Sequence, residues 1–264
     1  MSKSSNHASN FKPPYLVGVQ FRDFQFKRPN KFPFNLPWLE DFELEFPSPV
    51  TFLVGENGSG KSTLIESIAA LCGFPVSGGG RQEAANTFGP ELESELAQEL
   101  APVFIKRPQD GYFFRAEFYA QFASLLDQRA ADPDFIGDPY ESYGGRSLHT
   151  RSHGESFLEL MQNRLGDGLF LMDEPESALS PQRQLTLLAM IADRVANGKS
   201  QFIIATHSPI LLTYPGATIL SFDESPLAPI ELEDTSHFQI TKGILGRPQL
   251  YWQHLMPAKS EEPT

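Results

Sequence analysis

Apolar and polar residues alternate over two N-terminal stretches, Val17–Phe26 and Leu39–Phe46, and this pattern predicts two half-exposed β-strands separated by proline-rich turns. The next stretch, PVTFLVG at Pro49–Gly55, is continuously apolar, as in a strand that is buried on both faces. It leads into a glycine-rich loop and then into the helical sequence KSTLIESIAALCGF. The order of strand, glycine loop and helix predicts a phosphate-binding unit.

The second half of the chain predicts a parallel sheet. Two apolar strands, LFLMD and QFIIAT, flank the helical sequence PQRQLTLLAMIADRVANG. Upstream, ELESELAQEL predicts an acidic helix, GYFFRAEFYAQFASLLDQ a strand followed by a helix, and FLELMQNRL a further helix; after ATILSFD, an acidic segment and a last short helix are expected. We therefore expect an α/β fold of the P-loop NTPase class, a mainly parallel sheet flanked by helices. An antiparallel N-terminal β part and a helical insertion over residues 82–150 complete this expectation.

The length of 264 residues favours one domain over residues 15–256, preceded by a disordered lead-in at 1–14 and followed by a mobile tail at 257–264. The N-terminal segment lacks the apolar core of a secretory signal, and no apolar run has the length needed to cross a bilayer. Cys72 is the only cysteine, which suits a reducing compartment and a buried apolar position. These features predict a cytoplasmic protein without direct membrane insertion.

The formal net charge is −12, and the chain has 33 acidic against 21 basic residues. Binding of nucleic acid over the whole surface is disfavoured, because neutralising phosphates requires clustered Lys and Arg. A local basic groove, or one supplied by a partner protein, stays open.

The glycine loop GENGSGKS fits the pattern G-x-x-x-x-G-K-[ST] and lies between the buried strand and its helix. Backbone N–H groups and the helix N-terminus can surround phosphate oxygens, Lys61 can reach the β- and γ-phosphates, and Ser62 can bind Mg²⁺. The alternative is a glycine turn that only starts a helix. The candidate nucleotide-binding residues are Gly55, Glu56, Asn57, Gly58, Ser59, Gly60, Lys61, Ser62 and Thr63.

Two carboxylates, Asp173 and Glu174, end the apolar strand LFLMD. Beside a phosphate loop, Asp173 is placed to hold Mg²⁺, and Glu174 to orient or deprotonate an attacking water. His207 ends the next apolar strand, where it can contact a terminal phosphate. The alternatives are a solvated acidic turn and a structural histidine.

The segment TRSHGES precedes one predicted helix, and Ser152 with Glu155 fits a capping box. With the other motifs in order, the chain resembles the ABC-type ATPases, especially the soluble branch of RecF, of structural-maintenance-of-chromosomes heads and of double-strand-break-repair ATPase heads. It is also similar to small stand-alone bacterial ATPases. GENGSGKST resembles the Walker A motif, SHGE the signature motif, LFLMDEP Walker B, SALS the D-loop and THSP the switch-histidine segment.

The resemblance implies that ATP and Mg²⁺ are bound between two copies of the chain, which form a homodimer on ATP binding. Ser152 and Gly154 would then contact, in trans, the γ-phosphate held by the other copy. Ser177 and Ser180 would lie at the dimer seam, and His207 would sense the γ-phosphate. Because no coiled-coil pattern separates Lys61 from Ser152, the chain resembles a head without arms.

Parts of the chain depart from the family pattern. Arg151, His153 and Glu155 replace residues of the usual transporter signature. The sequence has no clean match to the Q-loop, and Gln121 and Glu117 are the candidates. The base of the nucleotide can pack near Arg22, Phe24 and Phe26, although a core strand explains these phenylalanines equally well.

The leading interpretation is an Mg²⁺-dependent ATPase whose hydrolysis reopens an ATP-bound homodimer and drives DNA maintenance, defence or a partner protein. A transporter's nucleotide-binding subunit is one alternative. A small-molecule kinase and a non-catalytic nucleotide sensor are two others.

Overall fold

A computed structural model describes residues 13–40, 42–81, 94–150 and 153–256. The predicted tail at 257–264 and nearly all of the predicted lead-in at 1–14 lie outside the described residues, as does Ser152.

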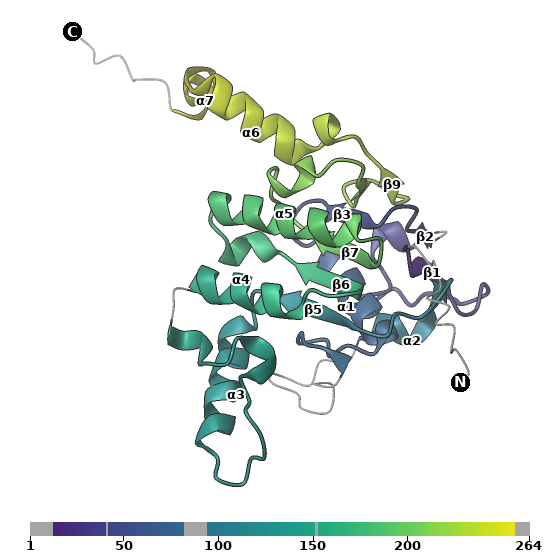
Figure 1. The fold of residues 1–264 in the computed structure, drawn as a ribbon. Coiled ribbons are helices and arrows are strands. Elements are labelled where there is room, and N and C mark those ends of the chain that lie inside the picture. The colour runs from purple at the N-terminus through teal and green to yellow at the C-terminus, as the bar shows by residue number, and fades with distance from the viewer. Residues whose placement is uncertain (1–12, 41, 82–93, 151–152, 257–264) are drawn as a thin grey trace, which may run out of the picture.

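The centre of the molecule is a six-stranded sheet (Figure 1). The strands, in their order across the sheet, are β5 (Gly111–Arg115), β6 (Gly168–Asp173), β7 (Ser200–Ala205), β3 (Val50–Val54), β8 (Thr218–Ser221) and β9 (Ala228–Pro229). The first five run parallel to one another, and β9 is antiparallel to β8. The four strands from β5 to β3 are buried along their whole length, which explains their continuous apolar sequences.

Successive side chains of the sheet enter two separate cores. Phe52 packs with α3 (Tyr119–Ala131), α4 (His153–Arg164) and α5 (Pro181–Ala196) on one face. Leu53 points to the other face, where α1 (Lys61–Cys72) covers the sheet. The alternation of side chains along a strand thus produces a helix layer on each side.

A second sheet of three antiparallel strands, β2 (Glu43–Glu45), β1 (Leu16–Phe21) and β4 (Leu100–Phe104), shares the core of α1. Both predicted N-terminal strands are shorter than expected. After Phe21 the chain turns, because the Asp23 carboxylate accepts a hydrogen bond from the Gln25 amide at 2.8 Å and so competes with strand pairing. The second strand begins late because residues 37–39 form a 3-10 helix (Pro37–Leu39).

Residues 82–150, predicted as a helical insertion, contribute to both sheets within their described part. They include the short helix α2 (Glu95–Glu99), β4 at the edge of the antiparallel sheet, β5 at the edge of the main sheet, and α3. The strand β4 was not predicted, because Pro102 interrupts its pattern. A proline is tolerated there because an edge strand leaves one row of backbone groups unpaired.

The C-terminal part forms two helices, α6 (Ser236–Gly246) and α7 (Pro248–Leu255), of which α7 matches the predicted last short helix and α6 was not predicted. The break lies at Arg247, which precedes a proline and has the non-helical angles φ −143° and ψ 64°. Neither helix buries a residue, and the pair lies at the end of the molecule opposite α3 (Figure 1). Of the helices in the described ranges, none is long and apolar enough to cross a bilayer.

Removal of a core aromatic ring tests this packing. Phe170 of β6 is fully buried and stacks on Phe202 of β7 with ring centroids 5.4 Å apart. We expect Phe170→Ala to lower the free energy of unfolding by about 3–5 kcal/mol, because burial is lost and a cavity remains. Phe24, which is 83% exposed, is the matched control, and Phe24→Ala should change stability by no more than about 0.5 kcal/mol in urea denaturation. Equal effects of the two substitutions would contradict the layered core.

The single cysteine provides a second test. Cys72 is buried at the end of α1, and burial raises the pKa of its thiol to about 12. Since the thiolate is the reactive form, the native protein should resist a thiol reagent at about pH 8, while the unfolded chain reacts. The folded state also binds the thiol proton more tightly than the unfolded chain does. The stabilisation that the protonated Cys72 thiol gives the folded state is therefore lost as the pH rises above the ordinary thiol pKa. Rapid labelling of native protein would contradict the burial.

Candidate functional site

The glycine loop Gly55–Thr63 connects the buried strand β3 to α1. Gly60 has φ +99°, and a Cβ atom added there would lie 2.8 Å from the indole nitrogen of Trp38 and 3.0 Å from Leu36. Both the backbone angle and the lack of space therefore require glycine. Glu56, Asn57 and Gly58 are exposed at the tip of the loop, and the Glu56 amide donates to Oδ1 of Asp223 at 2.8 Å.

Trp38 stabilises this loop, and this contact was not predicted from the sequence. Its side chain is 1% exposed, and its indole N–H donates to the carbonyl oxygen of Ser59 at 2.8 Å. The only sequence signal was a tryptophan in a proline-rich turn. That turn comes close to the loop through the tertiary fold.

Lys61, the first residue of α1, is buried with its ammonium on the loop itself. Its Nζ donates to the carbonyl oxygens of Gly55 at 2.7 Å and Glu56 at 3.0 Å. Burial lowers the pKa of Lys61, while the carboxylates of Glu174 and Asp173 oppose this shift. The ammonium is therefore held beside the loop, where it can donate to phosphate oxygens.

Ser62 and Asp173 come together from two different elements. The Ser62 hydroxyl, in the first turn of α1, donates to Oδ1 of Asp173 at the end of β6, at 3.2 Å. Asp173 is 8% exposed, and burial raises the pKa of its carboxyl to about 6. A hydroxyl and a carboxylate beside a phosphate loop are the oxygen ligands that Mg²⁺ uses together with phosphates, so this pair fits the ion.

Arg115 neutralises this buried carboxylate and was also missed. It ends β5 directly opposite Asp173 in the parallel register, and its side chain is 6% exposed. The guanidinium lies 2.9 Å from Glu66, 3.3 Å from Glu117 and 3.5 Å from Asp173, and it also donates to the Val76 carbonyl at 3.0 Å. The buried Asp173 and the half-buried Glu66 therefore share one buried cation.

Glu174 follows Asp173 in a strained backbone conformation. Its φ is +46°, and among the described residues it is the one non-glycine residue with a positive φ. Its amide donates to the Ala205 carbonyl at 2.9 Å, which ties it to the end of β7. The side chain is 44% exposed, so the carboxylate can meet a water molecule.

His207 lies beside Glu174, with Nε2 3.5 Å from Oε1 of that carboxylate. Its backbone amide donates to Oε1 of Glu176 at 2.5 Å, and Glu176 is a further residue that the sequence analysis did not identify. Burial is the main cause that lowers the pKa of His207, and Lys61 adds to the shift. His207 therefore favours the neutral form. We call the glycine loop Gly55–Thr63 the phosphate cradle.

The predicted signature segment is described from His153 onward. Gly154 lies in the first turn of α4, and a Cβ atom added there would lie 2.6 Å from the Ala178 carbonyl. Ser177 and Ser180 are exposed in the same region, and the Ser177 hydroxyl donates to the Glu174 carbonyl at 2.8 Å. The turn thus lies against the segment that follows Glu174. Thr63 is half-buried in α1.

Further candidates concern the Q-loop and the base of the nucleotide. Gln121 is exposed on α3, while Glu117 follows β5 and pairs with Arg115. For the base, Arg22 donates to the Leu100 carbonyl at 2.7 Å and Phe24 is exposed. A pocket of about 460 Å³ is lined by residues that include Phe24, Phe26 and Arg28. These assignments stay predictions.

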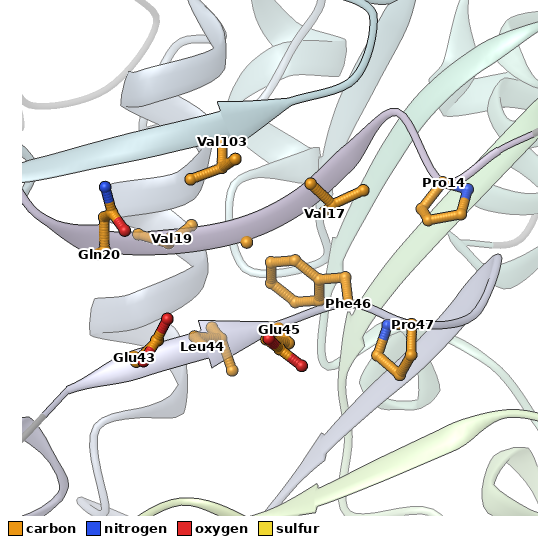
Figure 2. A pocket seen from close by; sticks show the side chains of 11 residues that line it. Pro14, Val17, Val19, Gln20, Glu43, Leu44, Glu45, Phe46, Pro47 and Val103 are labelled. Carbon is orange, nitrogen blue, oxygen red and sulfur yellow. The ribbon is translucent and has the colours of Figure 1, made fainter.

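Figure 2 shows another pocket, of about 450 Å³, which is lined by residues of the antiparallel sheet. Its lining includes Val17, Gln20, Glu43 and Glu45, and contains none of the residues of the glycine loop or of the Asp173–Glu174 pair. The pocket is therefore separate from the phosphate cradle.

The shared cation predicts the effect of its removal. Arg115→Met would leave the buried Asp173 and the half-buried Glu66 without their counter-charge, so we expect the free energy of unfolding to fall by about 3–5 kcal/mol. Glu117, whose side chain is 73% exposed, is the matched control, and Glu117→Gln should cost less than about 1 kcal/mol in the same urea titration. A neutral effect of Arg115→Met would show that the pairing does not stabilise the fold.

Known proteins resemble this chain over most of its length. Two family models described as AAA domains match residues 32–121 and 118–213, and the description of the second also names type IV toxin–antitoxin systems. The hemin import ATP-binding protein HmuV of Rhodopseudomonas palustris (strain BisB5) is 31% identical over 209 residues, which are 70% of this chain and 77% of that protein. ABC transporter E family member 1 of Arabidopsis thaliana is 25% identical over 210 residues, 74% of this chain and 32% of that protein.

Among solved structures, the SMC head domain from Thermotoga maritima is similar at 17% identity, with 83% of this chain and 100% of that chain covered and a TM-score of 0.42. The HmuV match extends over more than three quarters of a protein named for ATP binding, at 31% identity. The chain therefore belongs to the ABC-type P-loop ATPases, and this membership supports ATP binding and hydrolysis.

Proposed function

We propose that this protein is an Mg²⁺-dependent ATPase that converts ATP and water to ADP and phosphate. One observation carries the proposal: the carboxyl ends of β3, β6 and β7 bring the glycine loop, Asp173, Glu174 and His207 to one edge of the sheet. Ligands of open α/β sheets bind at this edge.

The loop Gly55–Thr63 binds the phosphates through its backbone amides and the N-terminus of α1. The ammonium of Lys61 then exchanges its contacts with the Gly55 and Glu56 carbonyls for phosphate oxygens. Ser62 and Asp173, which are hydrogen-bonded to each other, would hold Mg²⁺. When bound, Mg²⁺ neutralises part of the phosphate charge and favours the ionised form of Asp173.

Glu174 orients the attacking water and accepts its proton, because its carboxylate is partly exposed at the cradle and its backbone is fixed by the end of β7. His207 contacts the γ-phosphate from the neighbouring strand. Their 3.5 Å separation supports action on the same phosphate.

The second part of the proposal is that ATP joins two copies of the chain as a homodimer. Ser152 and Gly154 would contact the γ-phosphate in the partner copy, with Ser177 and Ser180 at the seam. The supporting observation is that the Gly154 turn packs on the segment directly after Glu174. A partner copy bound at this turn would therefore contact a segment that is hydrogen-bonded to the backbone of Glu174. Opening and closing of this cytoplasmic dimer would drive DNA maintenance, defence or a partner protein.

The likeness to an ATP-binding protein of hemin import favours one second candidate, the nucleotide-binding subunit of a transporter. The signature residues Arg151, His153 and Glu155 weigh against this candidate. A non-catalytic nucleotide sensor differs from both candidates, because its activity would not depend on the Glu174 carboxylate.

The decisive measurement is the mass of Glu174→Gln in solution, with and without ATP and Mg²⁺. We expect this variant to keep ATP binding, to lose turnover by roughly 100-fold or more, and to become a dimer only with ATP. Adding Ser152→Arg should abolish the dimer, because an arginine would occupy the place of the trans contact.

The matched control is Gly166→Arg in the same Glu174→Gln background. A Cβ atom at Gly166 meets nothing within 4 Å, and the residue precedes β6 at the edge of the sheet opposite the cradle. This variant should still dimerise. Unchanged turnover in Glu174→Gln would refute the catalytic role, whereas an unchanged mass despite ATP binding would refute only the homodimer.

A further inference from the structure

A second histidine contacts His207 from the C-terminal helix α6. Nε2 of His237 lies 2.9 Å from Nδ1 of His207, and the two ring centroids are 5.0 Å apart at an interplanar angle of 53°. His237 is half-buried, and α6 buries none of its residues. The contact therefore joins the phosphate site to an otherwise peripheral helix.

A hydrogen bond between two neutral imidazoles needs one proton, and its direction fixes both tautomers. If His207 donated from Nδ1, the lone pair of its Nε2 would face the carboxylate of Glu174 at 3.5 Å, which is unfavourable. If His237 donates from Nε2, His207 carries its proton on Nε2 and directs an N–H group at that carboxylate. Nδ1 of His237 can then accept from the Ser236 hydroxyl at 3.5 Å.

In the second direction, Nε2 of His207 carries an N–H group that a ligand can accept from. This atom is buried and, within the part of the chain that the structure describes, has no hydrogen-bond partner. In the second direction the N–H group faces Oε1 of Glu174 at 3.5 Å without a hydrogen bond to it, so it is available to an incoming anionic oxygen. Backbone donation to Glu176 fixes the position of the residue but leaves rotation of the ring to be set by His237.

We propose that His237 is a positioning residue that holds His207 in the Nε2–H tautomer and thereby presents an N–H donor to the terminal phosphate of ATP. This inference rests on the proposed ATPase function and deepens it. The hydrogen bond orients the ring in the same way as a partner on the second nitrogen orients a ligating histidine. The donor strengthens as charge develops on the phosphate during transfer.

The test compares His237→Ala with His237→Gln, because the glutamine side-chain amide can place an N–H donor near the position of Nε2 of histidine. We expect His237→Ala to lower kcat roughly 10- to 100-fold, the range seen when the partner of a ligating histidine is removed. The KM for ATP should change by less than about twofold, since the loss concerns the transition state. His237→Gln should recover most of kcat.

His254 on α7 is exposed and is the matched control, so His254→Ala should keep the wild-type rate. The ring ¹⁵N shifts of His207, read by long-range ¹H–¹⁵N correlation, report the tautomer independently of activity. They should show a proton on Nε2 in wild type and in His237→Gln, and a mixture of tautomers in His237→Ala.

A proton on Nδ1 of wild-type His207, or equal rates in His237→Ala and wild type, would overturn the inference and leave the ATPase proposal intact. Equal losses in the Ala and Gln variants, both folded by circular dichroism, would also overturn it. Absence of ATP hydrolysis by the wild type would instead refute the proposed function, while the tautomer measurement still decides the histidine pairing.

Discussion

Burial of the Asp173 carboxylate at the end of a hydrophobic strand is the constraint on which the rest of the site depends. An ionised group in this position needs a cation, and the register between β5 and β6 places Arg115 directly opposite. The same guanidinium binds Glu66 on α1, so that a strand, its neighbour and the helix after the glycine loop are fixed together. The proposed phosphate and metal site therefore lies where β5, β6 and α1 are connected through Arg115.

Much of this arrangement could be predicted from the sequence, because the required information is local. The strands β3, β6 and β7 are short apolar runs, and Gly55, Asp173 and Thr206 lie at or directly after their carboxyl ends. Since the strands are parallel, their carboxyl ends meet at one edge. Proximity of Ser62 to Asp173 and of Glu174 to His207 then follows from the order of the motifs.

The rest depends on contacts between residues far apart in the chain. Trp38, Arg115 and His237 have no motif around them, and each acquires its place through pairing of elements that no local pattern encodes. The edge strand β4 was missed for a related reason, because Pro102 breaks the alternation on which strand prediction relies. Conversely, the strand predicted beyond Phe21 failed because one side-chain hydrogen bond at Asp23 ended it early.

The environment of Trp38 has an optical consequence. The chain has two tryptophans: one is 1% exposed and hydrogen-bonded to the loop carbonyl of Ser59, and the other, Trp252, is 51% exposed on α7. Their emission therefore separates into a short-wavelength part from the protein interior and a long-wavelength part from the hydrated surface. A rearrangement of the glycine loop alters the first, whereas contact of another molecule with the C-terminal helices alters the second. The emission of Trp38 therefore reports on the glycine loop, and the emission of Trp252 reports on the C-terminal helices.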